Sequence, residues 1–323
     1  MKRLFVSIVF AAGAFFAFGQ GEFEAYRYGQ TDLLGTARYM SMAGAFGALG
    51  GDATAIVSNP GGLGVYRNSD VSISFGATNT NVNRRGELNG ALTNAALVFS
   101  FPVREESKLK NVNFSVSYNK IKDYNRVMRI QGKAQHISVT DYLADFTNYF
   151  DITEYDLKYV ENEYDPYNNI HIPYMSIMAC EADMMNFING AWYPLRQDYE
   201  KVASSFSQQE KGSASEWTLA LATNYNDIVF FGASLGVRYI NYQKWSDLKE
   251  DFDYGGSMTF RNDLYTRGAG INLKIGAIVQ PADFLRLGLS LHSPTFYYLE
   301  DRYYGSITPE NVKFDNGKFA EAH

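Results

Sequence analysis

The side chains that most often perform catalysis are few in this chain, and they are not spaced for a known reaction. None of the histidines His136, His171, His292 and His323 is paired with a Cys or Glu at zinc-ligand spacing. No Gly-x-Ser-x-Gly sequence is present, and the glycines of residues 47–51 are not followed by the Gly-Lys-Ser/Thr of a phosphate-binding loop. We therefore predict that the protein is not an enzyme and that it uses no cofactor.

Carboxylates are concentrated between Asp141 and Asp165, where they alternate with tyrosine and phenylalanine. Oxygen ligands of this kind can bind a metal ion, but no Asp-x-Asp-x-Asp-Gly loop is present. A solvated, charged outer face is the preferred interpretation of this segment. No metal site is predicted.

A second group of side chains is suited to binding apolar molecules. Tyr174 begins a series at helical spacing, and its other members are Ile177, Met178, Met184, Met185 and Ile188, followed by Trp192. Methionine-rich helical faces can form adaptable hydrophobic surfaces. We therefore treat these residues as a candidate ligand groove, with simple packing against the neighbouring strands as the alternative.

The most unusual segment runs from Ala37 to Arg67 and is rich in small residues. It is too rich in glycine for a stable helix and too irregular for a strand. It contains Asn59, Pro60, Gly61 and Gly62, which indicate a tight turn. Because it stands directly before a series of alternating segments, we predict that it forms a plug for the barrel that these segments would build.

The start of the chain has the features of an export signal. Lys2 and Arg3 precede an apolar run of about 15 residues, and small residues follow near Gly19. The run is short for a bilayer of about 30 Å, so a transmembrane helix is disfavoured. We expect residues 1–19 to be a cleaved signal peptide.

Composition narrows the class of exported protein. The formal net charge is -6, which argues against nucleic-acid binding. The single cysteine excludes an internal disulfide framework. Aromatic residues make up 15% of the chain, and no later segment is apolar for long enough to form a membrane helix. Together these features are typical of an outer-membrane β-barrel.

Hydrophobic residues alternate with polar or small ones in several segments. The alternating runs lie at residues 71–76, 112–119, 217–225, 231–239, 271–280 and 285–292. A period of two gives each strand one apolar and one polar face. Aromatic residues are expected near the strand ends, as in membrane-interface girdles, and are Phe75, Tyr118, Trp217, Tyr225 and Tyr239.

The connections divide the chain further. Polar turns at Asn224–Asp227 and Gln280–Asp283 join long strands, and about nine or ten strands are expected between Asp70 and Tyr304. Residues 140–212 interrupt the alternation of apolar and polar residues. The segment is too long for a plain loop, so it should have structure of its own. Within them, Asp198–Gln209 is predicted to form an amphipathic helix.

These features carry a specific resemblance. The segment from Ala37 to Ala53, the sequence Ser58-Asn59-Pro60-Gly61-Gly62-Leu63-Gly64 and the strands near 282–297 resemble the FadL/TodX family of outer-membrane transporters, in its Bacteroidetes-type form. The family motif is Asn-Pro-Ala-Gly, and here Gly61 replaces the alanine.

The resemblance implies a fold and a mechanism. It implies a 14-stranded transmembrane antiparallel β-barrel, with a hatch at residues 20–69 inside its lumen. The insertion at residues 140–212, which we expect to be extracellular and partly helical, is the least specific part of the resemblance. Fatty acids or aromatic hydrocarbons would be captured by outer loops, pass the moving hatch and leave sideways through the barrel wall. The expected partners are this ligand, outer-membrane lipid, lipopolysaccharide and the barrel-assembly machinery, with the protein monomeric in a Gram-negative cell.

The end of the sequence departs from this expectation. Nine or ten strands are fewer than fourteen, and the chain ends at His323 without the terminal aromatic residue of such barrels. We therefore expect residues 70–323 to be an incomplete barrel. Two other functions stay open: a non-transporting adhesin or structural barrel, and a haem receptor with His136 or His171 as axial ligand.

Overall fold

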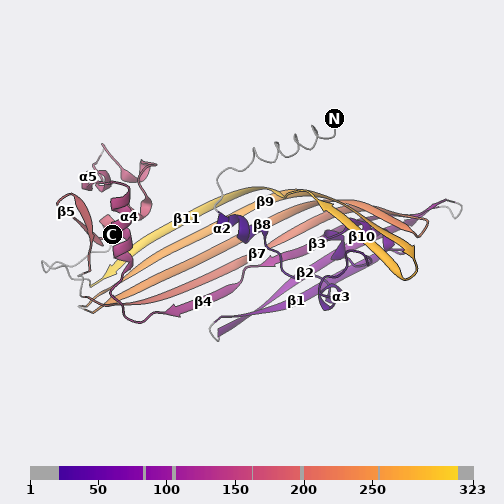
Figure 1. The fold of residues 1–323 in the computed structure, drawn as a ribbon, viewed down its shortest axis with the longest axis horizontal. Coiled ribbons are helices and arrows are strands. Elements are labelled where there is room, and N and C mark those ends of the chain that lie inside the picture. Colours follow the sequence, from indigo (N-terminus) through magenta and orange to yellow (C-terminus); the bar gives the residue numbers. More distant parts are fainter. Residues whose placement is uncertain are drawn as a thin grey trace.

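The computed structural model describes residues 22–82, 85–103, 107–161, 163–196, 200–253 and 255–311. The expected signal peptide at residues 1–19 lies outside this range. Most of the described chain forms an antiparallel sheet of nine strands (Figure 1). The strands are β1 (Asp70–Val82), β2 (Arg85–Pro102), β3 (Leu109–Asp123), β4 (Arg126–Gln131), β7 (Val202–Tyr225), β8 (Val229–Phe252), β9 (Ser257–Ala282), β10 (Leu285–His292) and β11 (Phe296–Glu310).

The sheet order is β1-β2-β3-β7-β8-β9-β10, with β4 also paired to β7 and β11 also paired to β9. β3 and β4 follow one another along β7, separated by Tyr124 and Asn125. β10 and β11 follow one another along β9 in the same way, on either side of Pro294. The antiparallel sheet and its number of strands confirm the coarse prediction. The closed 14-stranded barrel stays a prediction.

The three central strands are much longer than the alternating runs in the sequence indicate. β7 and β8 contain 24 residues each, and β9 contains 26. Trp217 and Tyr239 therefore lie inside strands and not at their ends. Phe75 in β1 and Tyr118 in β3 also lie inside their strands, which corrects the sequence prediction for these four residues. The strands continue beyond the apolar run because residues 202–216 of β7 pair without interruption with residues 238–252 of β8.

The predicted helix at 198–209 is also wrong within the described residues. From Val202 onward this segment belongs to β7, so the insertion between β4 and β7 ends before Val202. The Ser and Gln residues of 205–209 lie between β4 and β8 and pair with both strands. Pairing on both sides satisfies the backbone groups of this segment, which outweighs its weak helical pattern.

The insertion forms a compact unit at one end of the long strands (Figure 1). It contains α4 (Val139–Tyr149), α5 (Glu154–Leu157), η3 (Pro166–Asn168), α6 (Tyr174–Glu181) and the hairpin β5 (Met185–Ile188) and β6 (Ala191–Pro194). Ser138 begins α4 with a capping box, in which the Asp141 carboxylate accepts a hydrogen bond from the Ser138 amide at 2.8 Å.

The helical series predicted from Tyr174 to Ile188 is interrupted. α6 ends at Glu181, and the backbone turns at Asp183, whose φ is +54°. Met185 and Ile188 belong to β5, which pairs with β6 through a turn at Asn189 and Gly190. Both turn residues have positive φ, so the Asn-Gly pair is a hairpin signal that the helical interpretation overlooked.

Residues 22–69 lie across one face of the sheet. They contain α2 (Glu22–Gly29), α3 (Ala37–Ser41) and the short 3-10 helices η1 (Ala55–Val57) and η2 (Pro60–Val65). η2 contacts β8, β7, β9 and β3. Among the described residues, every helix is too short or too polar to cross a membrane.

Candidate functional site

In a water-soluble sheet the buried face is apolar and the exposed face is polar, and in this sheet the arrangement is reversed. We call the face that contacts η2 the covered face and the other the open face. On β7, Glu216 and Thr218 of the covered face are fully buried, whereas Trp217 and Leu221 of the open face are 50% and 56% exposed. Polar groups are thus enclosed and apolar groups are exposed.

The exposed apolar side chains form a belt that ends well before the strands do. On β7 the open face carries Trp217, Leu219, Leu221, Thr223 and Tyr225, and the residues before Trp217 are polar or small. Trp217 and Tyr225 are eight residues apart, which is about 26 Å along a strand. Aromatic rings therefore mark both ends of the belt on this strand.

Neighbouring strands continue the same belt. Val229–Tyr239 of β8 lies beside it, with Tyr239 opposite Ser215, and Tyr118 of β3 pairs with Trp217. The Tyr118 and Trp217 rings meet edge to face with their centroids 5.4 Å apart. Of the aromatic residues that the sequence placed at strand ends, Tyr118, Trp217 and Tyr239 thus lie near one end of the apolar belt, and Tyr225 lies at the other.

The predicted turn motif lies between the sheet and the rest of the N-terminal segment. Asn59 caps η2 by accepting a hydrogen bond from the Gly61 amide at 2.9 Å. Its side-chain amide donates to the Gly47 carbonyl at 2.6 Å and reaches the Ala277 carbonyl of β9 at 3.3 Å. Asn59, Pro60, Gly61 and Gly62 are all buried. Asn59 therefore joins the turn, the preceding loop and the sheet.

Glycines on both partners allow η2 to approach the strands closely. A β-carbon at Gly61 would come 2.9 Å from the Gly276 carbonyl oxygen, and one at Gly64 would come 2.7 Å from the Thr223 carbonyl oxygen. On the sheet, a β-carbon at Gly276 would come within 2.0 Å of Asn59 Oδ1. Neither side has space for a larger residue, so the contact is one of backbone against backbone.

Polar contacts hold the remaining parts of residues 22–69. Asp32 pairs with Lys122 at 2.6 Å and accepts a hydrogen bond from the Asp123 amide at 2.9 Å. Asn113 donates to the Leu63 carbonyl at 2.7 Å, and Arg286 donates to the Leu49 carbonyl at 3.0 Å. These contacts are spread over β3 and β10, so the segment is attached at separate points across the covered face.

A buried ion cluster lies on the covered face beyond η2. Glu216 accepts hydrogen bonds from Arg238 at 2.6 Å, from Thr218 at 3.0 Å and from Asn272 at 3.3 Å, and it pairs with Lys274. The Glu216 and Lys274 side chains are almost completely enclosed. The sequence places Arg238 and Lys274 on the polar sides of alternating runs, but it does not single out Glu216 as their partner.

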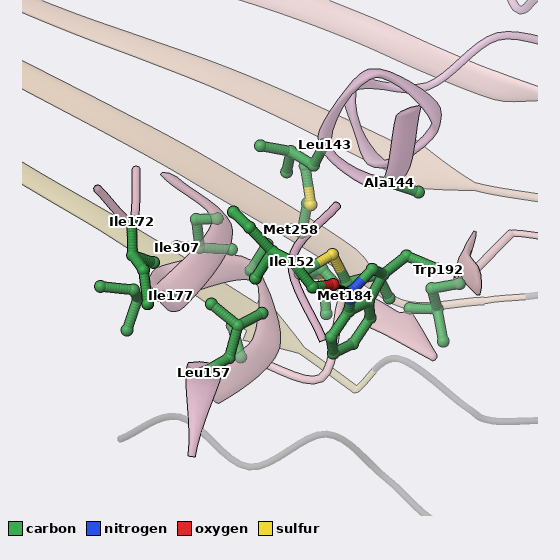
Figure 2. Packing of buried hydrophobic residues seen from close by; sticks show 14 of the residues in the cluster. Leu143, Ala144, Ile152, Leu157, Ile172, Ile177, Met184, Trp192, Met258 and Ile307 are labelled. Atoms are coloured by element: carbon green, nitrogen blue, oxygen red, sulfur yellow. Dashed lines mark hydrogen bonds between the residues drawn. The ribbon is translucent and has the colours of Figure 1, made fainter. Parts of the chain in front are cut away.

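The candidate groove residues of the insertion are mostly core residues. Ile177, Met184, Met185 and Trp192 are buried in one cluster with Leu143, Ile152 and Leu157, as Figure 2 shows for most of them. Trp192 also donates its indole hydrogen to the Ile152 carbonyl at 2.7 Å. Ile188 is exposed on β5. Met178 is half-buried and lines a cavity, unlike the four core residues.

Three cavities bear on binding. The largest, about 650 Å³, is a hollow in the apolar belt of the open face between Leu221, Phe231 and Leu289. A second, about 580 Å³, lies between α6 and the ends of β9 and β11. A third, about 280 Å³, lies beside the break at Tyr124 and Asn125 and is lined mainly by charged and polar residues. Sequence analysis identified Tyr174 and Met178 of the second cavity but not Tyr167, Tyr303 and Tyr304.

The other candidate ligands, histidines and carboxylates, are placed as follows in the described part of the chain, and the haem alternative stays a prediction. No group of three or more His, Cys, Asp or Glu side chains there is arranged to hold a metal ion. His136 and His171 are both exposed. His292 lies with its Nε2 atom 2.8 Å from the Ser58 carbonyl oxygen, and it therefore serves to attach the N-terminal segment.

The chain matches no protein-family model, no curated protein and no solved structure. The resemblance noted from the sequence therefore stays a prediction. A functional assignment rests on the distribution of polar and apolar groups over the two faces of the sheet.

Proposed function

We propose that the protein is an outer-membrane transporter of hydrophobic small molecules, such as fatty acids or aromatic hydrocarbons, and that residues 22–69 act as its hatch. The observation that carries the proposal is the apolar belt on the open face of the sheet. A belt of about 25 Å bounded by aromatic rings is typical of strands that face lipid. The polar groups of the opposite face are enclosed by the N-terminal segment, as a plugged lumen requires.

The exposed belt would be costly in water. Large side chains such as Leu221, Phe231 and Ile275 are about half exposed. For every Å² of apolar surface left in water, the protein forgoes about 25 cal/mol of burial free energy. Lipid removes this cost without a protein partner. This argument supports a membrane location and disfavours an exported soluble sheet.

The contacts of residues 22–69 are compatible with movement. Single hydrogen bonds and the half-buried Asp32–Lys122 ion pair attach the segment, and the buried apolar residues between η2 and the sheet are few. Water or a ligand can replace such contacts at modest cost. In the proposed cycle the insertion end captures the ligand, the segment shifts, and the ligand leaves sideways through the barrel wall.

A reversible lock tests this cycle. In a Cys180→Ser background, Asp32→Cys and Lys122→Cys would place two thiols where the ion pair now joins the segment to β3. Oxidation should reduce the uptake of labelled oleate or toluene by cells that express the protein, and reduction should restore it. Each single-cysteine variant controls for the loss of the ion pair.

Two results would reject the proposal. The hatch would be excluded if the disulfide, verified by mass spectrometry, left uptake unchanged. Transport itself would be excluded if the unlocked protein took up neither oleate nor toluene faster than cells that lack it.

A further inference from the structure

We propose that the cavity between α6 and the ends of β9 and β11 binds an organic ammonium cation through aromatic rings. This inference goes beyond hydrophobic transport and does not depend on it. The cavity has a volume of about 580 Å³. Its walls are Tyr167, Tyr174, Met175, Met178, Phe260, Asn262, Tyr303, Tyr304 and Gly305.

The aromatic walls come from opposite sides of the cavity. Tyr167 and Tyr174 belong to the insertion and are stacked, with ring centroids 5.9 Å apart and an interplanar angle of 24°. Phe260, Tyr303 and Tyr304 belong to the sheet. The face of an aromatic ring carries partial negative charge and attracts cations within about 6 Å. Several rings around one space are the usual way to recognise quaternary ammonium groups.

Carboxylates add negative charge on both sides of the cavity. The Tyr167 hydroxyl donates to Glu181 Oε2 at 2.7 Å, and the Tyr303 hydroxyl donates to Glu24 Oε1 at 3.2 Å. Burial raises the pKa of Tyr167, and the nearby charges of Glu181 and Asp165 raise it further. The same negative potential that disfavours a phenolate here favours a bound cation.

The neighbouring cations are already paired. No Lys or Arg belongs to the cavity walls in the part of the chain described by the structure. Arg261, next to Phe260, pairs with Asp247 at 2.7 Å, and Arg302, next to Tyr303, pairs with Glu300 at 2.8 Å. An anionic group such as a fatty-acid carboxylate would therefore lack a partner in this cavity, whereas a cation would find both rings and carboxylates.

The remaining walls indicate what the cation is attached to. Met175, Met178 and Phe260 supply an apolar surface, and Gly305 leaves open the space beside the Met178 side chain, whose Cε would lie 3.0 Å from a β-carbon there. The volume exceeds that of a trimethylammonium group. The ligand class is therefore an ammonium compound with an alkyl or aryl arm.

Choline and its uncharged isostere 3,3-dimethylbutan-1-ol provide a matched pair of probes. Each is titrated into the full chain in detergent micelles while tyrosine fluorescence and heat are recorded. Choline should bind at least about tenfold more tightly than the alcohol, because only the charged group gains from ring faces. Tyr174→Leu and Tyr304→Leu should each weaken choline binding by about three- to thirtyfold.

Further variants distinguish a loss of the binding site from a loss of folding. Glu181→Gln should weaken choline binding and leave binding of the alcohol unchanged. Tyr155→Leu is the matched control, because Tyr155 is an exposed tyrosine of the same insertion that stacks on Tyr164 outside the cavity. Near-ultraviolet dichroism, recorded in a background in which Trp217 and Trp245 are replaced by phenylalanine so that Trp192 is the remaining tryptophan, verifies that the insertion stays folded. The proposal is overturned if choline does not bind, if the alcohol binds equally well, or if folded Tyr174→Leu and Tyr304→Leu proteins bind choline normally.

Discussion

The carbonyl oxygen of Pro60 lies in the space that a side chain on Gly232 would occupy, since a β-carbon at Gly232 would come within 2.5 Å of it. Pro60 begins η2, and Gly232 lies near the start of β8. The turn that the sequence identifies by its asparagine and proline therefore depends on a glycine about 170 residues later. The η2 part of the N-terminal segment can lie this close to the sheet only where neither backbone carries a side chain at the contact.

Gly232→Ala should therefore loosen the N-terminal segment. We expect a loss of about 1–3 kcal/mol in the stability of its docking, because the added methyl group forces η2 away from the sheet. The rate of proteolysis within residues 22–69 measures this loss. Gly90→Ala is the control, since no atom lies within 4 Å of a β-carbon at this position in β2. Equal proteolysis of both variants would contradict the close contact.

Asn59 should contribute through two separate contacts. Asn59→Ala removes the cap of η2 and the links to Gly47 and Ala277, so we expect a cost of about 1–2 kcal/mol. Asn59→Asp keeps the acceptor for the Gly61 amide but loses the donor to Gly47. If both contacts matter, the Asp variant should lie between the wild type and the Ala variant in proteolysis of residues 22–69. If the Asp variant is as sensitive to proteolysis as the Ala variant, the whole effect comes from the lost side-chain donor of Asn59.

The ion cluster around Glu216 should be sensitive to loss of its only carboxylate. Glu216→Gln leaves the buried Lys274 and the mostly buried Arg238 without a negative partner, and we expect a cost of about 3–5 kcal/mol. The double variant Glu216→Gln with Lys274→Met should recover part of this stability. Denaturant unfolding of the four proteins in a double-mutant cycle measures the coupling. Additive effects of the two substitutions would show that the pair does not interact.

Some of the architecture can be predicted because it is local. Leu219 and Leu221 alternate with polar or small neighbours, which predicts a two-faced strand, and Asn226 and Asp227 form the predicted turn with positive φ. Asn59 and Pro60 predict the start of η2 by the same kind of local rule. Alternation does not, however, say which face is enclosed. That difference depends on residues 22–69 lying across the sheet.

Other features depend on partners that are distant in sequence. Residues 202–212 form a strand because β4 and β8 pair with them, and nothing in their own composition indicates this. Met184 and Met185 resemble a binding surface until the segments around Leu143 and Ile152 cover them. Tyr303 and Tyr304 become cavity walls only when α6 lies against β11. Their sequence signal is a tyrosine pair that many strands share.

Cys180 provides a probe of the insertion. Burial raises the pKa of its thiol to about 11, and the nearby Asp183 adds to the shift. At a pH of about 8 its alkylation by iodoacetamide should be on the order of tenfold to 100-fold slower than that of a free thiol. The rate should continue to rise with pH toward about 11, whereas a free thiol reaches its plateau earlier. Protein unfolded in urea serves as the control and should react at the free-thiol rate.

The apolar belt makes the sharpest prediction about the membrane. Leu221 lies midway between Trp217 and Tyr225 on the open face, so Leu221→Arg would place a charge at the centre of the proposed lipid-facing band. We expect a cost of about 2–4 kcal/mol for folding into lipid vesicles, as found for cations near the bilayer midplane. Gln209→Arg is the matched control, because Gln209 lies on the same face of the same strand outside the belt. It should cost less than about 1 kcal/mol.

Denaturant titration of vesicle-bound protein, followed by tryptophan fluorescence, compares the two arginine variants. A membrane-embedded belt requires the Leu221 variant to be the less stable of the two, because only there does the guanidinium replace a lipid contact. A belt that faces water predicts no difference between the two variants, since arginine at either position would then be solvated and the exposed leucine would be no loss. Equal stability of the two variants would therefore remove the main support for the proposed location, whatever the uptake assays show.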